Sequence, residues 1–450
     1  MISVVIPVRN GERDLERCLA ALEQSHYPHY ECIVVDDGSS DGSARVAEGR
    51  GCRLIRVGAS RGPAAARNRG AREARGDILF FIDADVCVRP DSLGRVAAAF
   101  DAEPELDALI GSYDEKPDAP DFLSQYKNLM HCYVHQSAQE TASTFWSGCG
   151  AIRSAVFERY SGFSEDYRRP AIEDIELGYR LTADGRKILL DKNLQVKHLK
   201  AWSFWRLLKT DVFDRGIPWT ELILRDANMP NDLNVQISQR ISVALVYLML
   251  IAVGGMAVHF KGLFLVPLLL LLVLLLSGYW FHDWTASRSR VRLLIPIALL
   301  FGASIYFAWR LHMLALIPPL AVTLTMIYLQ HRFLRANRSS RVYAALTGLC
   351  LAGTIGFILS FMPQHPVIVL PFVLLILVLF LNSQFYVFLR GRKNFLFALT
   401  AVPFHLLYHF YNGISFCAGT LLYWTRRKRP EAPARAAPAK AAGQPSGQIK

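Results

Sequence analysis

The stretch Phe80-Phe81-Ile82-Asp83-Ala84-Asp85-Val86 decides which fold this sequence encodes. The apolar run 78–82 is short and lacks helical spacing, which predicts a buried strand. Two carboxylates, Asp83 and Asp85, follow it. In an open α/β sheet the ligand crevice lies at the carboxyl ends of the strands, so both acids should lie at its mouth. They suit Mg²⁺ or Mn²⁺, although Asp is also common in plain turns.

Short apolar strands alternate with helical segments around this stretch. The predicted strands are 3–8, 30–35, 54–57, 78–82 and 106–110, and the predicted helices are 12–25, 64–74 and 91–100. This alternation is typical of βαβ units, so we predict an α/β fold with a mainly parallel sheet covered on both faces.

Three of these strands end in polar loops that should face one crevice: 7–10, Asp36-Asp37-Gly38-Ser39 and 83–85. The segment 61–70, which opens a helix at Pro63 and contains several arginines, lies between them in sequence. A helix N-terminus of this kind attracts anions. Carboxylates that bind a metal ion, next to a basic helix N-terminus, are the groups that binding of a diphosphate requires. No glycine-rich dinucleotide fingerprint follows the first strand, which disfavours a nicotinamide-binding domain.

Two later motifs carry further candidates. Trp146-Ser147-Gly148 belongs to a small-residue segment that would let the backbone approach a ligand, or that forms a plain turn. Glu173-Asp174 begins a predicted helix, where the macrodipole alone would account for one acid.

Together these motifs resemble family 2 glycosyltransferases, which have the GT-A fold. The resemblance rests on six segments that occur in the family's order and spacing over roughly residues 1–200. The segments are 3–10, 34–43, 65–70, 80–86, 145–154 and 173–180.

The resemblance implies a role for each candidate in handling a nucleotide-sugar donor. The metal, Mg²⁺ or Mn²⁺, would be bound by Asp83 and Asp85 and would stabilise the leaving diphosphate as a Lewis acid. Nucleotide contacts are assigned to Pro7, Val8, Arg9, Asp36, Asp37 and Arg67. Donor or acceptor contacts are assigned to Trp146, Ser147, Gly148, Glu173, Arg215 and Trp219.

The resemblance also makes Asp174 the general base of an inverting transfer. A positioned base is worth about 10²–10⁴-fold in rate. A polyprenyl phosphate is already ionised and needs no base, whereas a hydroxyl does, so the motif favours a hydroxyl acceptor.

Three further candidates lie downstream. His198, at the end of a predicted strand, is assigned to the metal, with a structural role as the alternative. Arg215 and Trp219 lie where the family's membrane synthases carry a Gln-x-x-Arg-Trp motif. Here the Gln is absent and the arginine precedes the tryptophan by four residues. This departure disfavours processive polymer synthesis.

The second half of the chain has the composition of a membrane domain. The 450 residues are 52% hydrophobic with net charge +12, and the long apolar runs begin near residue 235. Arginines cluster in alternate connections between the runs, as the positive-inside rule requires, which explains the charge better than a nucleic-acid surface. The expected spans, each close to the length that crosses a bilayer, are 240–259, 262–281, 293–309, 311–329, 342–362 and 367–389.

The last apolar segment, 394–424, precedes four basic residues. A hairpin bending at Pro403 or Asn412-Gly413 keeps these inside, so we predict a hairpin or interfacial segment. His405, Tyr408, His409 and Asn412 share one helical face there and could hold a lipid head group or face other helices.

We therefore divide the chain into four parts. They are a cytoplasmic GT-A domain (1–200), interfacial amphipathic helices (201–235), a transmembrane domain of about six spans (236–425) and a disordered basic tail (426–450). Scattered cysteines and the absence of a signal-peptide pattern favour a cytosol-facing enzyme in the inner (plasma) membrane.

The leading hypothesis is a membrane-bound inverting glycosyltransferase. It would move a sugar from a nucleotide-sugar donor to a hydroxyl of a lipid or lipid-linked glycan, with no nucleic-acid partner. The alternatives are a processive polysaccharide synthase and a transporter or flippase with a degenerate nucleotide-binding domain. The presence of Asp37, Asp83, Asp85 and Asp174 argues against the last.

Overall fold

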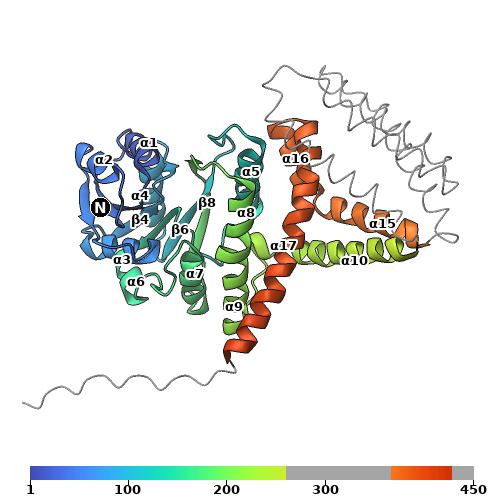
Figure 1. Ribbon diagram of the computed structural model, residues 1–450. Coiled ribbons are helices and arrows are strands. Elements are labelled where there is room, and N and C mark those ends of the chain that lie inside the picture. The colour runs from blue at the N-terminus through green and yellow to red at the C-terminus, as the bar shows by residue number, and fades with distance from the viewer. Residues whose placement is uncertain (260–365, 428–450) are drawn as a thin grey trace, which may run out of the picture.

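An eight-stranded sheet forms the centre of the N-terminal region in the computed structural model, which describes residues 1–259 and 366–427 (Figure 1). Its strand order is β3-β2-β1-β4-β7-β6-β8-β5. The strands are β1 (Ile2–Val8), β2 (Tyr30–Asp36), β3 (Arg53–Arg56), β4 (Ile78–Ile82), β5 (Val86–Cys87), β6 (Ala108–Tyr113), β7 (Cys149–Arg153) and β8 (Ile188–His198).

The predicted α/β fold is confirmed, and the sheet proves to be mixed. The β3-β2-β1-β4 half is parallel throughout, with Val8 opposite Asp36 and Val5 opposite Phe81. Strand β7 runs antiparallel to both β4 and β6. Because β1, β2 and β4 are parallel, their carboxyl ends and the loops that follow lie at the same edge of the sheet.

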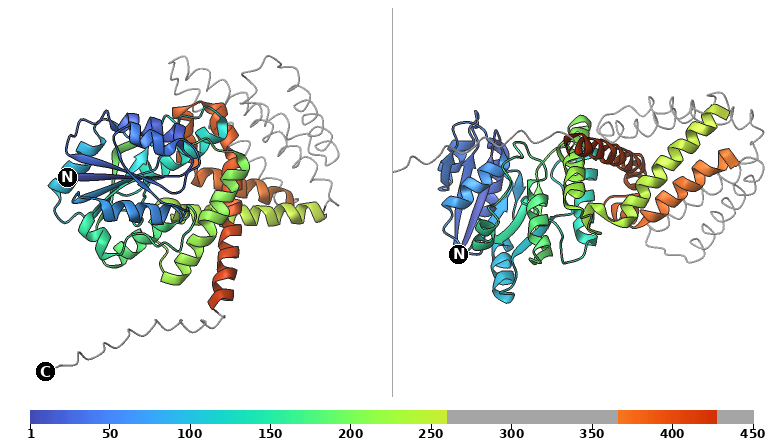
Figure 2. Two further views of the ribbon diagram at one scale, coloured as in Figure 1. Left: turned by 60° about the vertical axis from the view of Figure 1, so that its left-hand side comes forward. Right: turned by 90° about the horizontal axis from the view of Figure 1, so that it is seen from below.

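Helices cover both faces of this sheet (Figures 1 and 2). They are α1 (Glu12–Leu22), α2 (Ser43–Gly49), α3 (Pro63–Glu73), α4 (Ser92–Ala102), α5 (Phe122–Ser137), α6 (Ser154–Arg159) and α7 (Glu173–Ala183). Several predicted boundaries were wrong by one to three residues. The first helix ends at Leu22 rather than residue 25. The strand expected over 106–110 begins at Ala108, because Leu106 still belongs to a turn and donates its N–H to Glu103 (2.9 Å).

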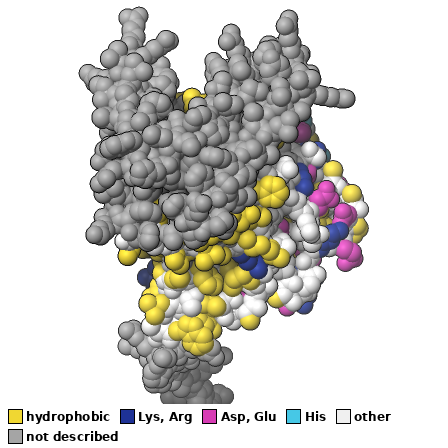
Figure 3. All heavy atoms as spheres, turned by 90° about the vertical axis from the view of Figure 1, so that its right-hand side faces the viewer, with side chains coloured by type: hydrophobic (Ala, Val, Ile, Leu, Met, Phe, Trp, Pro, Cys, Tyr) yellow, Lys and Arg dark blue, Asp and Glu magenta, His cyan; other side chains and the backbone are white. Residues whose placement is uncertain are grey.

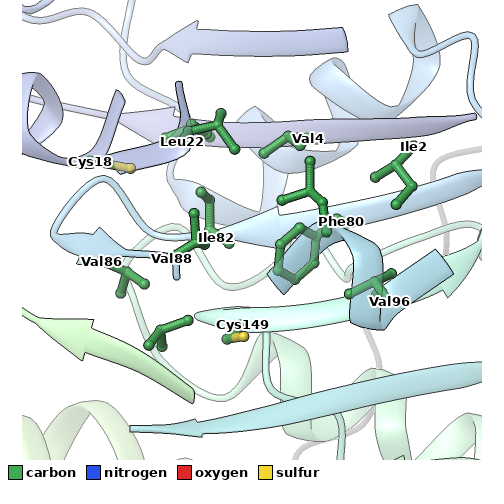
Figure 4. Close-up of a cluster of buried hydrophobic side chains, with 14 of the residues drawn as sticks. Ile2, Val4, Cys18, Leu22, Phe80, Ile82, Val86, Val88, Val96 and Cys149 are labelled. Carbon is green, nitrogen blue, oxygen red and sulfur yellow. The ribbon is translucent and has the colours of Figure 1, made fainter. Parts of the chain in front are cut away.

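The alternation of side chains along β4 explains why the deciding stretch is apolar throughout. Phe80 and Ile82 belong to a cluster on one face of the sheet with residues of β1, α1 and α4 (Figure 4). Phe81 belongs to a second cluster with Phe145 and Phe163. A strand buried on both faces has no solvent-facing positions, and an uninterrupted apolar run is the result.

After residue 203 the described chain contains helices and no strands. Its elements are α8 (Phe204–Lys209), the π-helix η1 (Thr210–Gly216), α9 (Ile217–Asp226), the 3₁₀ helix η2 (Leu233–Val235), α10 (Ile237–His259), α15 (Pro366–Leu381), α16 (Ser383–Arg392) and α17 (Phe395–Arg427).

The predicted hairpin in the last apolar segment is wrong, since α17 is one helix of 33 residues. Pro403 lies inside it without ending it. Gly413 is not a bend but a point of close helix contact, where a Cβ atom would lie 2.2 Å from Tyr247 of α10. Gly216 meets Ser415 in the same way. Packing against these neighbours keeps α17 continuous where local sequence signals predict a break.

Helix α17 shares a core with the N-terminal region. Its Phe397, Ala401 and Phe404 pack in one buried cluster with Phe122 and Tyr126 of α5. The views in Figures 1 and 2 agree that α17 runs alongside α9. The N-terminal α/β region and the C-terminal helices are therefore joined by a buried apolar interface.

A buried ionic group crosses the same interface. Lys127 of α5 and Tyr411 of α17 both donate to the Oδ2 atom of Asp211 in η1, at 2.6 and 2.5 Å. Lys127 is 3% exposed and Asp211 6%. Removing either partner of a buried pair leaves an uncompensated charge, so this group fixes η1 between the two helices.

Within the described ranges, one helix has the length and hydropathy of a membrane span, Ile237–Met256 of α10, with mean hydropathy 1.8. The run expected over 367–389 is broken at Asn382, where α15 and α16 meet at 62°. Asn382 donates to Ser242 of α10 and to the carbonyl of Val378 (2.8 and 2.9 Å), which stabilises the break. The four other expected spans lie outside the described residues.

Apolar side chains are exposed along these helices. Ile251 and Val258 of α10 and Phe380 of α15 are 70%, 81% and 74% exposed. Figure 3 shows hydrophobic side chains gathered in a band on this side of the molecule.

Candidate functional site

The loops after β1 and β2 are bound to each other at the carboxyl edge of the sheet. Asn10, in the left-handed region (φ 52°), accepts from the N–H of Ser40 and donates its own N–H to Ser39 (2.8 and 2.9 Å). Gly42 and Glu12 are linked similarly (3.0 Å). The predicted convergence of these loops is confirmed, and their hydrogen bonds make that edge rigid before any ligand arrives.

The two acids of the second loop have different surroundings. Asp37 is 4% exposed and accepts from the hydroxyl of Ser60 and the backbone N–H groups of Arg61 and Gly62 (2.6, 2.9 and 3.0 Å). It therefore orders the loop that leads into α3. Asp36 accepts from the N–H of Ser39 with Oδ1 (2.9 Å), and no described residue bonds its Oδ2. Asp36 is thus the better placed of the two for a nucleoside.

The three candidates at the end of β1 also differ. Arg9 is exposed and Pro7 half-buried, so both can line a base. Val8 is 3% exposed and packs in the core, and its carbonyl accepts from the N–H of Asp37 (2.9 Å). A nucleotide contact through the side chain of Val8 is therefore corrected to a structural role.

Arg67 is buried and holds two of the predicted site acids. Its guanidinium donates to Oδ1 of Asp83 (2.6 Å) and Oε1 of Glu173 (3.0 Å), and its side chain is 5% exposed. The expectation that Arg67 binds the nucleotide directly needs correction, because a buried guanidinium with two carboxylate partners has little surface left for a ligand. Arg67 instead links the end of β4 to the start of α7.

Glu173 is likewise occupied by internal partners. Its second carboxylate oxygen accepts from the N–H of Ala171 (2.9 Å), and the residue is 4% exposed. Burial raises the pKa of Glu173 and nearby Asp174 raises it further, whereas Arg67 lowers it. The predicted sugar contact by Glu173 is therefore corrected to a positioning role.

Asp85 faces His198 across the end of the sheet. Its Oδ2 lies 3.6 Å from Nε2 of His198, and Nδ1 of that ring donates to Oδ1 of Asn128 (2.7 Å). Tyr113 stacks on the same ring at 4.3 Å. Burial alone would raise the pKa of Asp85, but the hydrogen bond and charge of His198, with Lys200, lower it to about 2.

These groups suit a cation that is completed by its substrate. Within the described residues, no three acidic, His or Cys side chains lie close enough to enclose a metal. Asp83 and Asp85 are nevertheless 35% and 25% exposed, and His198 bonds Asn128 through Nδ1 and turns Nε2 toward Asp85. Mg²⁺ and Mn²⁺ commonly take one or two carboxylates and complete their shell with phosphates and water. The residues present fit such an ion.

Ser147 orients the predicted base, Asp174. Both its backbone N–H and its hydroxyl donate to Oδ2 of Asp174 at 3.0 Å. The other oxygen, Oδ1, accepts from the N–H of Ile175 (2.9 Å). Asp174 lies in the first turn of α7, next to Glu173 and hence one residue from the Arg67 bridge to Asp83. The structure thus joins the predicted base to the predicted metal acids.

The glycines near Ser147 accommodate aromatic rings of the protein itself. A Cβ atom on Gly148 would lie 2.8 Å from the indole of Trp146, and one on Gly150 would lie 2.7 Å from the ring of Phe145. Gly148 is buried, so the expected close approach of its backbone to a ligand is corrected to internal packing. Trp146 is half-buried and meets Tyr113 edge to face (4.8 Å).

Arg215 and Trp219 lie in different surroundings. Burial raises the pKa of Tyr113, as do Asp85 and Asp83, while Arg215 opposes the shift. The charge of Arg215 therefore acts on the same pocket as the two acids. Trp219 points elsewhere, donating from Nε1 to the hydroxyl of Tyr179 (3.0 Å) and lining a cavity between α9, α10 and α17.

Sequence reasoning missed several residues that shape the site. Tyr113 and Asn128 fix the ring of His198, and Lys127 and Asp211 fix the π-helix that carries Arg215. Lys127 and Asn128 carried no distinguishing signal, because other polar residues such as Gln125 and His131 lie beside them in α5. A π-helix is often found at functional sites, although its position is not readable from composition.

A parallel half-sheet with acidic loops at its carboxyl edge defines an α/β domain suited to a nucleoside diphosphate and its metal. Residues 3–161 match the family model "Glycosyl transferase family 2". This part of the chain belongs to that family, and the resemblance inferred from the six motifs is confirmed.

Curated relatives match the same region. A validoxylamine A glucosyltransferase from Streptomyces hygroscopicus subsp. limoneus is 29% identical over 227 residues, covering 41% of this chain and 48% of the relative. The putative glycosyltransferase EpsH of Bacillus subtilis is 30% identical over 190 residues, covering 41% and 51%. The chain thus spans about half the length of the curated relatives it matches.

Solved structures align at low scores. The mannosyltransferase PcManGT from Pyrobaculum calidifontis, in complex with GDP-Man and Mn²⁺, is 17% identical, with TM-score 0.40 and coverage of 69% of this chain and 82% of that one. TarS 1-349 of S. aureus with UDP-GlcNAc is 18% identical, with TM-score 0.39 and coverage of 50% and 66%.

Proposed function

We propose that this chain is a membrane-associated, metal-dependent glycosyltransferase. It transfers a sugar from a nucleotide-sugar donor to a hydroxyl of a lipid or lipid-linked glycan, inverting the anomeric configuration. The observation that carries the proposal is the chain of contacts Ser147–Asp174, Glu173–Arg67–Asp83, which places one oriented carboxylate beside the pair of acids at the sheet edge.

The donor side of the proposal rests on the carboxyl edge of the sheet. Asp36 and Arg9 would contact the nucleoside, while Asp83, Asp85 and His198 would hold a divalent cation. When bound, that cation supplies Lewis-acid stabilisation of the departing diphosphate. Arg215, for which no described residue supplies an ion-pair partner, would add positive charge on the same side.

The proton chemistry is assigned to Asp174. Two donors from Ser147 hold Oδ2, which leaves the outer lone pair of Oδ1 to accept the proton of an acceptor hydroxyl. An oxygen that attacks from the side of Asp174 while the diphosphate leaves on the side of Asp85 inverts the anomeric carbon. Fixing the base in advance contributes to rate because no reorientation is needed in the transition state.

The placement against a membrane rests on exposed apolar surface. Trp205 of α8 and Phe213 of η1 are 75% and 63% exposed and neighbour Arg206 and Lys209, a mixture that suits the lipid–water interface. Helix α10 has the length and hydropathy of a span. Phe213 and Arg215 belong to the same π-helix, so an acceptor held in the bilayer would reach the site from this side.

A donor screen tests the proposal. Purified full-length chain would be incubated with UDP-, GDP- and dTDP-sugars, Mn²⁺ and a lipid extract, and nucleotide release and sugar incorporation into lipid would be measured. We expect release from one donor class to rise when the extract is added, and sugar to appear in the lipid phase. Release that is indifferent to lipid, with no labelled lipid, would contradict the acceptor assignment.

A further inference from the structure

A cavity of about 460 Å³ lies between α9, α10 and α17, outside the crevice that holds the acids. This volume is within the range of small-molecule sites. Its walls are mainly apolar, with polar groups of Trp219, Gln239 and Asn412 among them. Close packing normally fills such a space, so a cavity of this size at the junction of three helices needs an explanation.

His409 of α17 lines this cavity and lacks hydrogen-bond partners. The residue is 0% exposed, and neither Nδ1 nor Nε2 has a partner among the described residues. A buried polar group without a partner costs free energy of folding. An imidazole beside an open space can recover that energy when a ligand places an oxygen there.

The cavity opens toward the lipid-facing side of the molecule. Ala244 of α10 lines it and is exposed, and further along the same helix Leu248 and Ile251 are 51% and 70% exposed. The apolar wall of the cavity is thus continuous with the surface of the one described helix that could cross a bilayer.

The inner end of the cavity reaches elements of the catalytic site. Gly216 lines it and directly follows Arg215 in η1. Trp219 also lines it and donates to Tyr179 of α7, the helix whose first turn carries Asp174. One end of the space is therefore lined by the residue that follows Arg215 and by a side chain hydrogen-bonded to α7.

We propose that this cavity binds the hydrocarbon chain of the lipid acceptor, with His409 hydrogen-bonded to an oxygen of its head group. The inference rests on the proposed function for the identity of the lipid as acceptor. A chain entering beside Ala244 would be aligned along α10 with its head directed to Trp219 and Gly216. The acceptor would thereby be delivered to Asp174 without leaving the bilayer.

The test uses hexadecanol carrying a mid-chain diazirine as probe, with the full-length chain in lipid nanodiscs and labelled peptides identified by mass spectrometry. We expect labelling of the α10 and α17 segments that line the cavity. Ala244→Trp, which fills the cavity, should lower that labelling about tenfold, the effect of a modest loss of binding free energy. Ile251→Trp, on the exposed part of the same helix outside the cavity, should leave it unchanged.

Two further measurements distinguish a loss of binding from misfolding of a variant. In the unmodified chain, hexadecanol should slow maleimide modification of Cys417, which is exposed and lines the cavity. His409→Phe keeps an aromatic ring and removes both unpartnered nitrogens, so the melting temperature without probe should not fall. Labelling by the diazirine alcohol should fall in this variant, whereas labelling by a diazirine alkane should not.

The outcomes separate the two proposals. The lipid cavity is overturned if Ala244→Trp leaves the labelling unchanged. It is also overturned if labelling avoids both helices because a protein segment or a second copy fills the space. Cavity labelling with no sugar transfer to any lipid supports the cavity and overturns the proposed function. Sugar transfer to a lipid without labelling of the cavity supports the proposed function and overturns the lipid cavity.

Discussion

Ser147 donates its backbone N–H and its hydroxyl to the same carboxylate oxygen of Asp174, each at 3.0 Å. The two residues lie in different elements, a glycine-rich loop before β7 and the first turn of α7, so the tertiary fold brings them together. This pair fixes the direction in which the other carboxylate oxygen of Asp174, Oδ1, points. The following predictions start from it.

Ser147→Ala removes one of the two donors and leaves the backbone N–H in place. A hydrogen bond to a charged group is worth about 1.5–3 kcal/mol, so kcat should fall by roughly 10–100-fold. The donor KM should change little, because Ser147 orients the base and not the nucleotide. Steady-state kinetics with a fixed acceptor measures both values. Ser164→Ala, whose hydroxyl lies 3.5 Å from Asp166 on the surface, should have no effect.

Arg67→Ala should destabilise the fold strongly. It leaves Asp83 unpaired and strips the buried Glu173 of its cation, and breaking a buried pair costs about 3–5 kcal/mol. Arg69→Ala removes an exposed pair with Glu73 on the same helix and should cost less than about 1 kcal/mol. Denaturant unfolding of both variants gives the comparison. Equal stabilities would mean that the Arg67 bridge is not what holds α3, β4 and α7 together.

Tyr411→Phe should loosen the joint between the catalytic region and α17. The hydroxyl of Tyr411 is one of two donors to the buried carboxylate of Asp211, so its loss should cost about 1.5–3 kcal/mol. The hydroxyl of Tyr423, on the same helix, has no hydrogen-bond partner within the described chain, and Tyr423→Phe should be neutral. Thermal unfolding of the full chain in detergent tests this. An unchanged melting temperature in Tyr411→Phe would rule out a structural role for the group.

Asp85→Ala should abolish the dependence of nucleotide binding on metal. In the unmodified chain, EDTA should weaken binding of the donor nucleotide and added Mn²⁺ should restore it. In the variant, Mn²⁺ should make no difference to the titration. Asp91→Ala, at the exposed start of α4, is the matched control and should behave like the unmodified chain. A metal response that survives in Asp85→Ala would remove this residue from the metal site.

Local signals predicted much of the fold and the first residues of the site. Strand ends and helix starts are encoded within a few residues, so the positions of Asp83 and Asp85 after β4 and of Asp174 in the first turn of α7 followed from spacing and family resemblance.

Local signals failed where packing decides the outcome. Arg67 has the sequence context of an anion site at a helix start, yet the fold buries it between two carboxylates. Pro403 and Gly413 are helix breakers in isolation. Contact with α5 and with Tyr247 overrides them in α17. In each case the missing information includes a partner far away in the sequence, such as Glu173, which lies 106 residues after Arg67.

The central claim is that Asp174 takes the proton while the metal acids hold the diphosphate. Asp174→Asn keeps both hydrogen bonds from Ser147 possible and removes the charge, so it separates the two roles. Transfer and nucleotide binding would be measured side by side in the presence of Mn²⁺. We predict that transfer falls at least about 10²-fold while metal-dependent binding of the donor is unchanged. Full transfer activity in Asp174→Asn would contradict the mechanism.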